Sequence, residues 1–128
     1  MPAKDWRSRV RLHRFKVEEA RRQVGEIELM IGELSRKRDE LTAGIRFEEE
    51  RSGVGDPGHV QYPPAALDMR KRRDNLDKSI SDLKEQLQVA SARVKEAQLE
   101  LEKAELMLDK QRGEMAAEAD GMHSARPM

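Results

Sequence analysis

Apolar residues recur in this chain at alternating steps of three and four positions, in one stripe before residue 52 and a second stripe after residue 64. A heptad repeat of this kind places its apolar members on one narrow side of an α-helix. Such a stripe is wide enough to cover one partner helix, and the rest of each helix stays in water. The predicted coiled-coil core comprises Val17, Val24, Ile27, Ile31, Leu34, Leu41, Leu76, Ile80, Leu83, Leu87, Val94, Leu101 and Leu108.

The two stripes are interrupted once, by SGVGDPGHVQYPP, which contains three glycines and three prolines. Gly53 is suited to end the first helix and Pro64 to begin the second. We therefore expect an all-α fold, an antiparallel two-helix coiled-coil hairpin over residues 1–116, with arms at 4–52 and 64–116 and a loop at 53–63. The second stripe ends at Met115, and residues 117–128 are predicted to form a disordered tail.

The alignment of the two arms is predicted less directly. Pairing Glu48 with Arg73 and Val17 with Ala104 sets an acid against a base and a large residue against a small one. A shift by one heptad stays open. The polar stripe residues Arg38 and Arg73 are interpreted as fixing this alignment rather than as ligand-binding residues.

Composition argues against an enzyme. Charged residues make up 39% of the chain and aromatic residues 3%, and there is no cysteine. A chain this polar cannot enclose a roomy pocket, and no spacing typical of catalytic, metal or phosphate-binding residues occurs. We expect no cofactor, no metal and no small-molecule substrate. The net charge of zero argues against nucleic-acid binding, and the absence of an apolar span or signal segment favours a cytoplasmic protein.

The charges are unevenly distributed, since residues 4–16 are mainly basic and residues 96–120 mainly acidic. The two segments adjoin in a hairpin, so their charges either pair with each other or leave a basic surface that binds an acidic partner. Several apolar residues also lie off the stripe and are available to a partner. The candidate partner-binding residues are Arg7, Arg11, Leu12, Arg14 and Phe15 in the first arm and Tyr62 in the loop, although Tyr62 could instead pack the loop onto the helices.

Three stretches resemble the FliJ proteins of bacterial flagellar type III export, in particular those of alphaproteobacteria. They are LHRFKVEEARRQVGEIE in the first arm, EEERSGVGDPGHVQYPP across the break and RRDNLDKSISDLKEQL in the second arm. The middle stretch is more specific than a coiled-coil repeat. The resemblance covers about residues 8 to 108, and it implies a helical hairpin similar to the γ-subunit coiled coil of rotary ATP synthases.

The same resemblance implies a non-enzymatic stalk of the export ATPase hexamer, which promotes assembly and activity of that ring. It also implies contacts with the export gate membrane protein and with export chaperones, and a cytoplasmic location peripheral to the inner membrane at the flagellar base. The alternative is a self-associating structural coiled coil, in which two hairpins form a four-helix bundle without a role in export.

Overall fold

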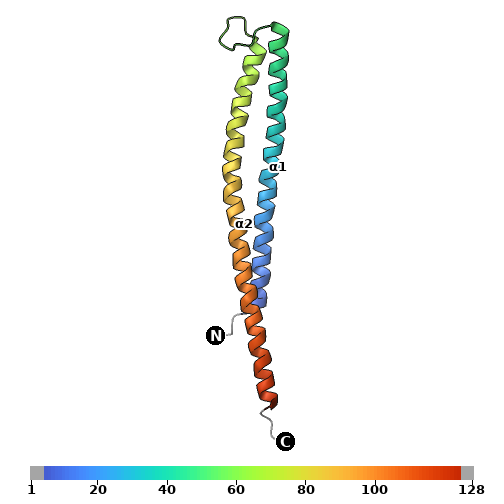
Figure 1. Cartoon of the computed structure of the whole chain (residues 1–128), viewed down its shortest axis with the longest axis vertical. Helices are drawn as coiled ribbons and strands as arrows, with labels where there is room; N and C mark the ends of the chain where they lie inside the picture. Colours follow the sequence, from blue (N-terminus) through green and yellow to red (C-terminus); the bar gives the residue numbers. More distant parts are fainter. Residues whose placement is uncertain (1–4, 125–128) are drawn as a thin grey trace. The chain divides into compact units, whose positions relative to one another are not determined.

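The computed structural model describes residues 5–124, and side chains up to residue 121. It contains two long α-helices, α1 over Trp6–Ser52 and α2 over Pro64–Ser124, and no strand among the described residues. The helices run antiparallel and pack against each other (Figure 1). The predicted all-α hairpin is therefore confirmed.

Local capping explains where the helices begin and end. The carboxylate of Asp5 accepts a hydrogen bond from the backbone N–H of Arg7 (3.1 Å) and one from the hydroxyl of Ser8 (2.9 Å), so Asp5 caps the start of α1. Gly53 has φ of 73° and donates its N–H to the carbonyl of Glu49 (2.9 Å). This left-handed conformation suits glycine and ends α1. Pro64 occupies the first position of α2, where a missing N–H costs nothing.

Helix α2 is longer than the sequence suggested. It continues to Ser124, so the predicted disorder from residue 117 is wrong for residues 117–124, while residues 125–128 lie outside the described part. Ala116, Ala117 and Ala119 have high helix propensity, and Gly121 lowers helix stability without ending the helix. Met115 is 63% exposed, because no residue of α1 covers it.

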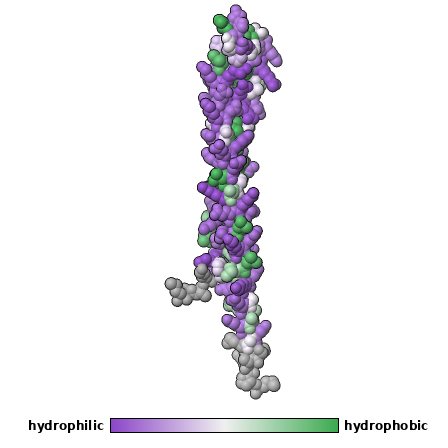
Figure 2. Space-filling model, turned by 60° about the vertical axis from the view of Figure 1, so that its left-hand side comes forward, coloured by the Kyte–Doolittle hydropathy of each residue, from purple (hydrophilic) through white to green (hydrophobic). Residues whose placement is uncertain are grey.

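The chain divides into two compact units. The terminal unit comprises Met1–Gln23 and Ala90–Met128, and the loop unit comprises Val24–Val89. In each unit the core is a narrow strip between α1 and α2, and every predicted core position is buried or half-buried. No polar side chain among the described residues is buried. Figure 2 shows a mostly hydrophilic surface with separate hydrophobic patches on the visible side.

The alignment in the loop unit differs from the preferred pairing. Arg73 donates a hydrogen bond to the hydroxyl of Thr42 (3.4 Å) rather than lying opposite Glu48. Arg38 pairs with Asp77 (3.8 Å). A shift by one heptad places Leu41, the neighbour of Thr42, opposite Arg73, so the structure has an alignment close to the alternative that the sequence left open. Arg38 and Arg73 each bridge the two helices, as expected for residues that fix the alignment.

Candidate functional site

The first three turns of α1 present a row of arginines in the terminal unit. Arg7, Arg11 and Arg14 follow one another at steps of four and three, so they lie on one side of α1. Together with Glu105, Asp109 and Arg112 of α2 they line a groove whose floor includes Val10 and Leu108. The structure thus brings the three predicted arginines together beside the other helix.

These arginines are not used in ion pairs between the helices. Neither Arg7 nor Arg14 forms an ion pair with any described residue, and the guanidinium of Arg11 donates a hydrogen bond to the hydroxyl of Ser8 (3.3 Å). The acidic residues Glu105 and Asp109 line the same groove without pairing to them. The two helices thus bring opposite charges to one groove without closing ion pairs there, and binding of an acidic partner to the arginines stays a prediction.

Two large apolar side chains accompany the arginines. Leu12 is 49% exposed and Phe15 is 58% exposed. Leu12 lies two positions after Val10, and Phe15 lies two positions after His13, and both of these earlier residues face the core. Two positions correspond to a rotation of about 200° around the helix axis, so Leu12 and Phe15 lie on the outer side of α1. The hairpin therefore does not bury Leu12 or Phe15. Whether they bind a partner stays a prediction.

The outer side of α2 carries apolar residues that the sequence interpretation missed. Leu99 is 57% exposed and Leu106 is 68% exposed. They lie seven positions apart, and each follows a core residue, Ala97 or Ala104, by two positions. Leu12 and Phe15 have the same offset of two positions from the heptad stripe. This offset is therefore the sequence signal that identifies Leu99 and Leu106 as outward-facing residues.

His13 lies on the core side of α1 and is half-buried. Together with Trp6 and Arg9 it lines a second groove of the terminal unit, whose other side includes Lys103 and Met107. The Nδ1 atom of His13 is buried and has no hydrogen-bond partner among the described residues. A buried polar atom without a partner costs free energy, so His13 fills a position of the core stripe less favourably than an apolar residue would.

Tyr62 is not an exposed contact residue. Its side chain is only 7% exposed. The hydroxyl donates a hydrogen bond to Oε1 of Glu49 (2.9 Å) and accepts one from Nε of Arg70 (2.8 Å), and the guanidinium of Arg70 also contacts Glu49 (3.0 Å). The partner-contact prediction for Tyr62 is wrong, because its ring and hydroxyl pack the loop onto both helices. At the loop, Val60 is the exposed apolar residue, at 99%.

The charges of this cluster stabilise one another. Hydrogen bonds from Arg70 and then from Tyr62 hold the pKa of Glu49 below its ordinary value. Hydrogen bonds to Tyr62 and Glu49 raise the pKa of Arg70. The guanidinium of Arg70 also lies 5.8 Å from the centre of the Tyr62 ring. Glu49, Tyr62 and Arg70 therefore act as a clamp that holds the end of the loop against α1 and α2.

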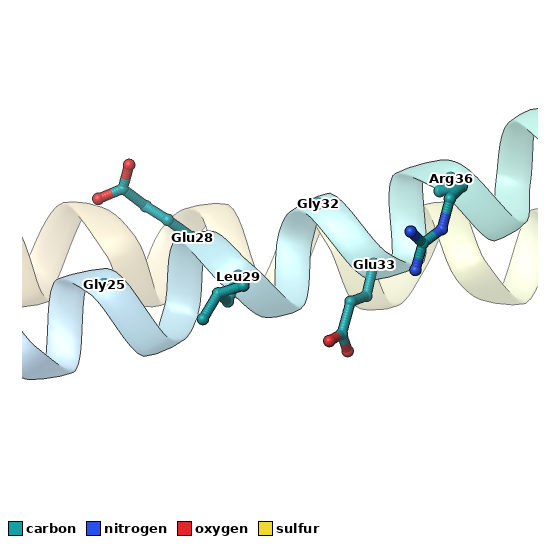
Figure 3. A pocket seen from close by; sticks show the side chains of 6 residues that line it. All are labelled: Gly25, Glu28, Leu29, Gly32, Glu33 and Arg36. Atoms are coloured by element: carbon teal, nitrogen blue, oxygen red, sulfur yellow. The ribbon is translucent and has the colours of Figure 1, made fainter.

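A shallow hollow occurs on α1 in the loop unit (Figure 3). It forms where Gly25 and Gly32 lack side chains, and it is bordered by Glu28, Leu29 and Glu33. Leu29 is 67% exposed between the two glycine positions. Apart from the adjoining residues and the backbone of α1 itself, no atom lies within 4 Å of the place that a Cβ would occupy at either glycine. The packing of the hairpin therefore does not require glycine at these two positions.

No helix in the described part of the chain is long and apolar enough to cross a membrane. Over the same residues, no three His, Cys, Asp or Glu side chains are grouped so that they could hold a metal ion. No protein-family model matches the chain, and neither a curated protein nor a solved structure shows significant similarity to it.

Proposed function

We propose that this chain is a non-enzymatic component of the bacterial flagellar type III export apparatus, which binds the export ATPase ring through its terminal unit. The proposal starts from the sequence resemblance to FliJ proteins. The structural observation that carries it is the start of α1, where Arg7, Arg11 and Arg14 lack ion pairs next to the exposed Leu12 and Phe15.

The chemistry of this surface defines the kind of partner. Arginines without ion pairs attract a partner that presents carboxylates, and they increase the rate of encounter at low salt. Leu12 and Phe15 lie one turn apart and offer apolar anchors for a pocket on the partner. In this proposal the protein acts as a stalk that promotes assembly and activity of the ATPase hexamer. It also links the ring to the export gate and to export chaperones, in the cytoplasm at the inner membrane of the flagellar base.

The test is binding to the cognate export ATPase and stimulation of its ATP hydrolysis. We expect Leu12→Ser with Phe15→Ser, or Arg7→Glu with Arg11→Glu and Arg14→Glu, to weaken both. Added salt should weaken binding of the parent protein, because exposed charges are screened beyond about 8 Å at physiological ionic strength. Circular dichroism checks that the variants keep their helix content.

Matched controls lie in the loop unit. Leu29→Ser changes a residue as exposed as Phe15, and Val60→Ser changes the exposed loop position; both should stimulate the ATPase like the parent. If the α1 variants stimulate the ATPase fully and Val60→Ser no longer stimulates it, the loop end binds the ring and the assignment to the terminal unit is wrong. Phe47 is a further exposed apolar residue of the loop unit, at 63%. If the parent protein forms tight oligomers, and Leu29→Ser with Phe47→Ser dissociates them, the four-helix bundle is supported instead.

A further inference from the structure

The outer sides of the two helices in the terminal unit each carry a pair of exposed apolar residues. We call Leu12 and Phe15 the α1 pair, and Leu99 and Leu106 the α2 pair. These four side chains are between 49% and 68% exposed. Each outer side faces away from the other helix, so a single chain cannot bring the two pairs together.

The two pairs lie at the same level of the terminal unit. His13 of α1 and Ala104 of α2 line one groove between the helices. The α1 pair lies on either side of His13 in sequence, and the α2 pair lies on either side of Ala104. Because the helices run antiparallel (Figure 1), each pair therefore extends along the same stretch of the hairpin, on opposite outer sides.

Opposite charges surround the two pairs. Residues 5–16, around the α1 pair, contain four arginines and one lysine against a single aspartate. Residues 96–109, around the α2 pair, contain five acidic residues against one lysine. The two outer sides are therefore complementary in charge as well as apolar.

The charges next to the pairs also lie on one side of the hairpin. Arg11 precedes Phe15 by four positions, and Asp109 follows Leu106 by three, so each is a neighbour of an apolar residue on its helix surface. Arg11 and Asp109 line the same groove. Glu102, one heptad before Asp109, lies on the same side of α2. None of these three charged side chains forms an ion pair with a described residue.

We propose that copies of this chain bind side by side in the same orientation, with the α1 pair of one copy packed on the α2 pair of the next. In this arrangement the groove sides of neighbouring copies face the same way. Arg11 of one copy then lies next to Glu102 and Asp109 of the neighbouring copy. The contact is short, so the association is weak and depends on protein concentration and salt.

The contact is heterologous, because it joins two different surfaces. Every added copy leaves one α1 pair and one α2 pair available, so association continues beyond a dimer as an open row or closes as a ring. A four-helix bundle of two hairpins would instead stop at the dimer. The proposal does not rest on the proposed function, because it is measured on the protein alone and its failure leaves ATPase binding untouched.

Sedimentation equilibrium of the full chain tests the proposal. The average mass of the parent protein should rise with concentration past that of a dimer. Leu12→Ser with Phe15→Ser, and separately Leu99→Ser with Leu106→Ser, should each weaken association at least about tenfold, since burial of one leucine side chain corresponds to at least this change in affinity. Glu102→Lys with Asp109→Lys should also weaken it, because like charges then meet Arg11.

A mixture of the two serine variants gives the sharper result. The first variant keeps its α2 pair and the second keeps its α1 pair, so one intact contact can form between them. We expect a one-to-one dimer with the affinity of the parent contact and no larger species. The control is Leu29→Ser, which changes a residue of the loop unit that is 67% exposed and should associate as the parent does.

Circular dichroism checks that all variants remain helical, since the changed positions are exposed. A parent protein that is monomeric at every concentration overturns the proposal, and so does a closed dimer that does not grow. It is also overturned if any of the three surface variants associates like the parent, if the mixture forms no dimer, or if Leu29→Ser abolishes association.

Discussion

Substitution of glycines by alanine offers a sharp test of the hairpin, because three glycines of one chain should respond in three different ways. Glycine in the interior of an exposed helix is about 1 kcal/mol less favourable than alanine, since it loses more backbone freedom on folding. At Gly32 the added Cβ would have no atom within 4 Å apart from the adjoining residues and the backbone of its own helix. We therefore expect Gly32→Ala to gain the full ~1 kcal/mol, or about 4 °C in melting temperature.

The other two glycines should gain less or lose. A Cβ at Gly44 would lie 2.8 Å from Sδ and 3.3 Å from Cε of Met69, so this side chain must move and part of the gain is lost. Gly53 has φ of 73°, which costs a residue with a side chain about 1 kcal/mol. The expected order of stability is Gly32→Ala, then Gly44→Ala, then Gly53→Ala, with Gly53→Ala below the parent protein.

Thermal unfolding followed by circular dichroism measures this series. Gly25→Ala serves as a repeat of Gly32→Ala, because its Cβ position is equally open. The two sites lie about 10 Å apart along the helix, so the double variant should gain close to the sum, about 2 kcal/mol. A Gly32→Ala variant less stable than the parent, or a Gly53→Ala variant more stable than Gly32→Ala, would refute the reasoning.

Three further predictions concern the clamp and the core. Tyr62→Phe should destabilise the hairpin by about 1–2 kcal/mol in urea unfolding, because the hydroxyl joins Glu49 and Arg70, whereas Val60→Ala should have little effect. The pKa of Glu49 is lowered on folding from its ordinary value of 4.5, so its contribution is present above that pH and is lost as the pH falls below it. Glu49→Gln should therefore remove part of the acid sensitivity, and equal acid profiles for parent and variant would contradict this. Leu34→Asp or Leu87→Asp should destabilise by at least about 2 kcal/mol, while Glu19→Ala should change stability by less than about 0.5 kcal/mol; equal melting temperatures for all three would contradict the core assignment.

The candidate site was predictable only in part. Leu12 and Phe15 could be identified from the sequence. The apolar stripe uses two positions of each heptad, and these two residues occupy neither of them. Leu99 and Leu106 follow the same rule on α2 and were overlooked. Tyr62 could not be assigned, since the sequence does not show whether an aromatic residue in a loop faces solvent or the helices. Its position depends on Glu49 and Arg70, which are distant in sequence and meet it only in the folded hairpin.

The sequence by itself determined the two helices, the loop at 53–63 and the side of each helix that is buried. These features depend on local properties: the heptad period, the conformational freedom of Gly53 and the fixed geometry of Pro64. The tertiary structure decided the alignment of the helices, the clamp at Tyr62 and the arginines left without ion pairs. A heptad repeat is nearly unchanged by a shift of seven residues, so contacts such as Arg38 with Asp77 and Arg73 with Thr42 select one alignment only when both helices are in place.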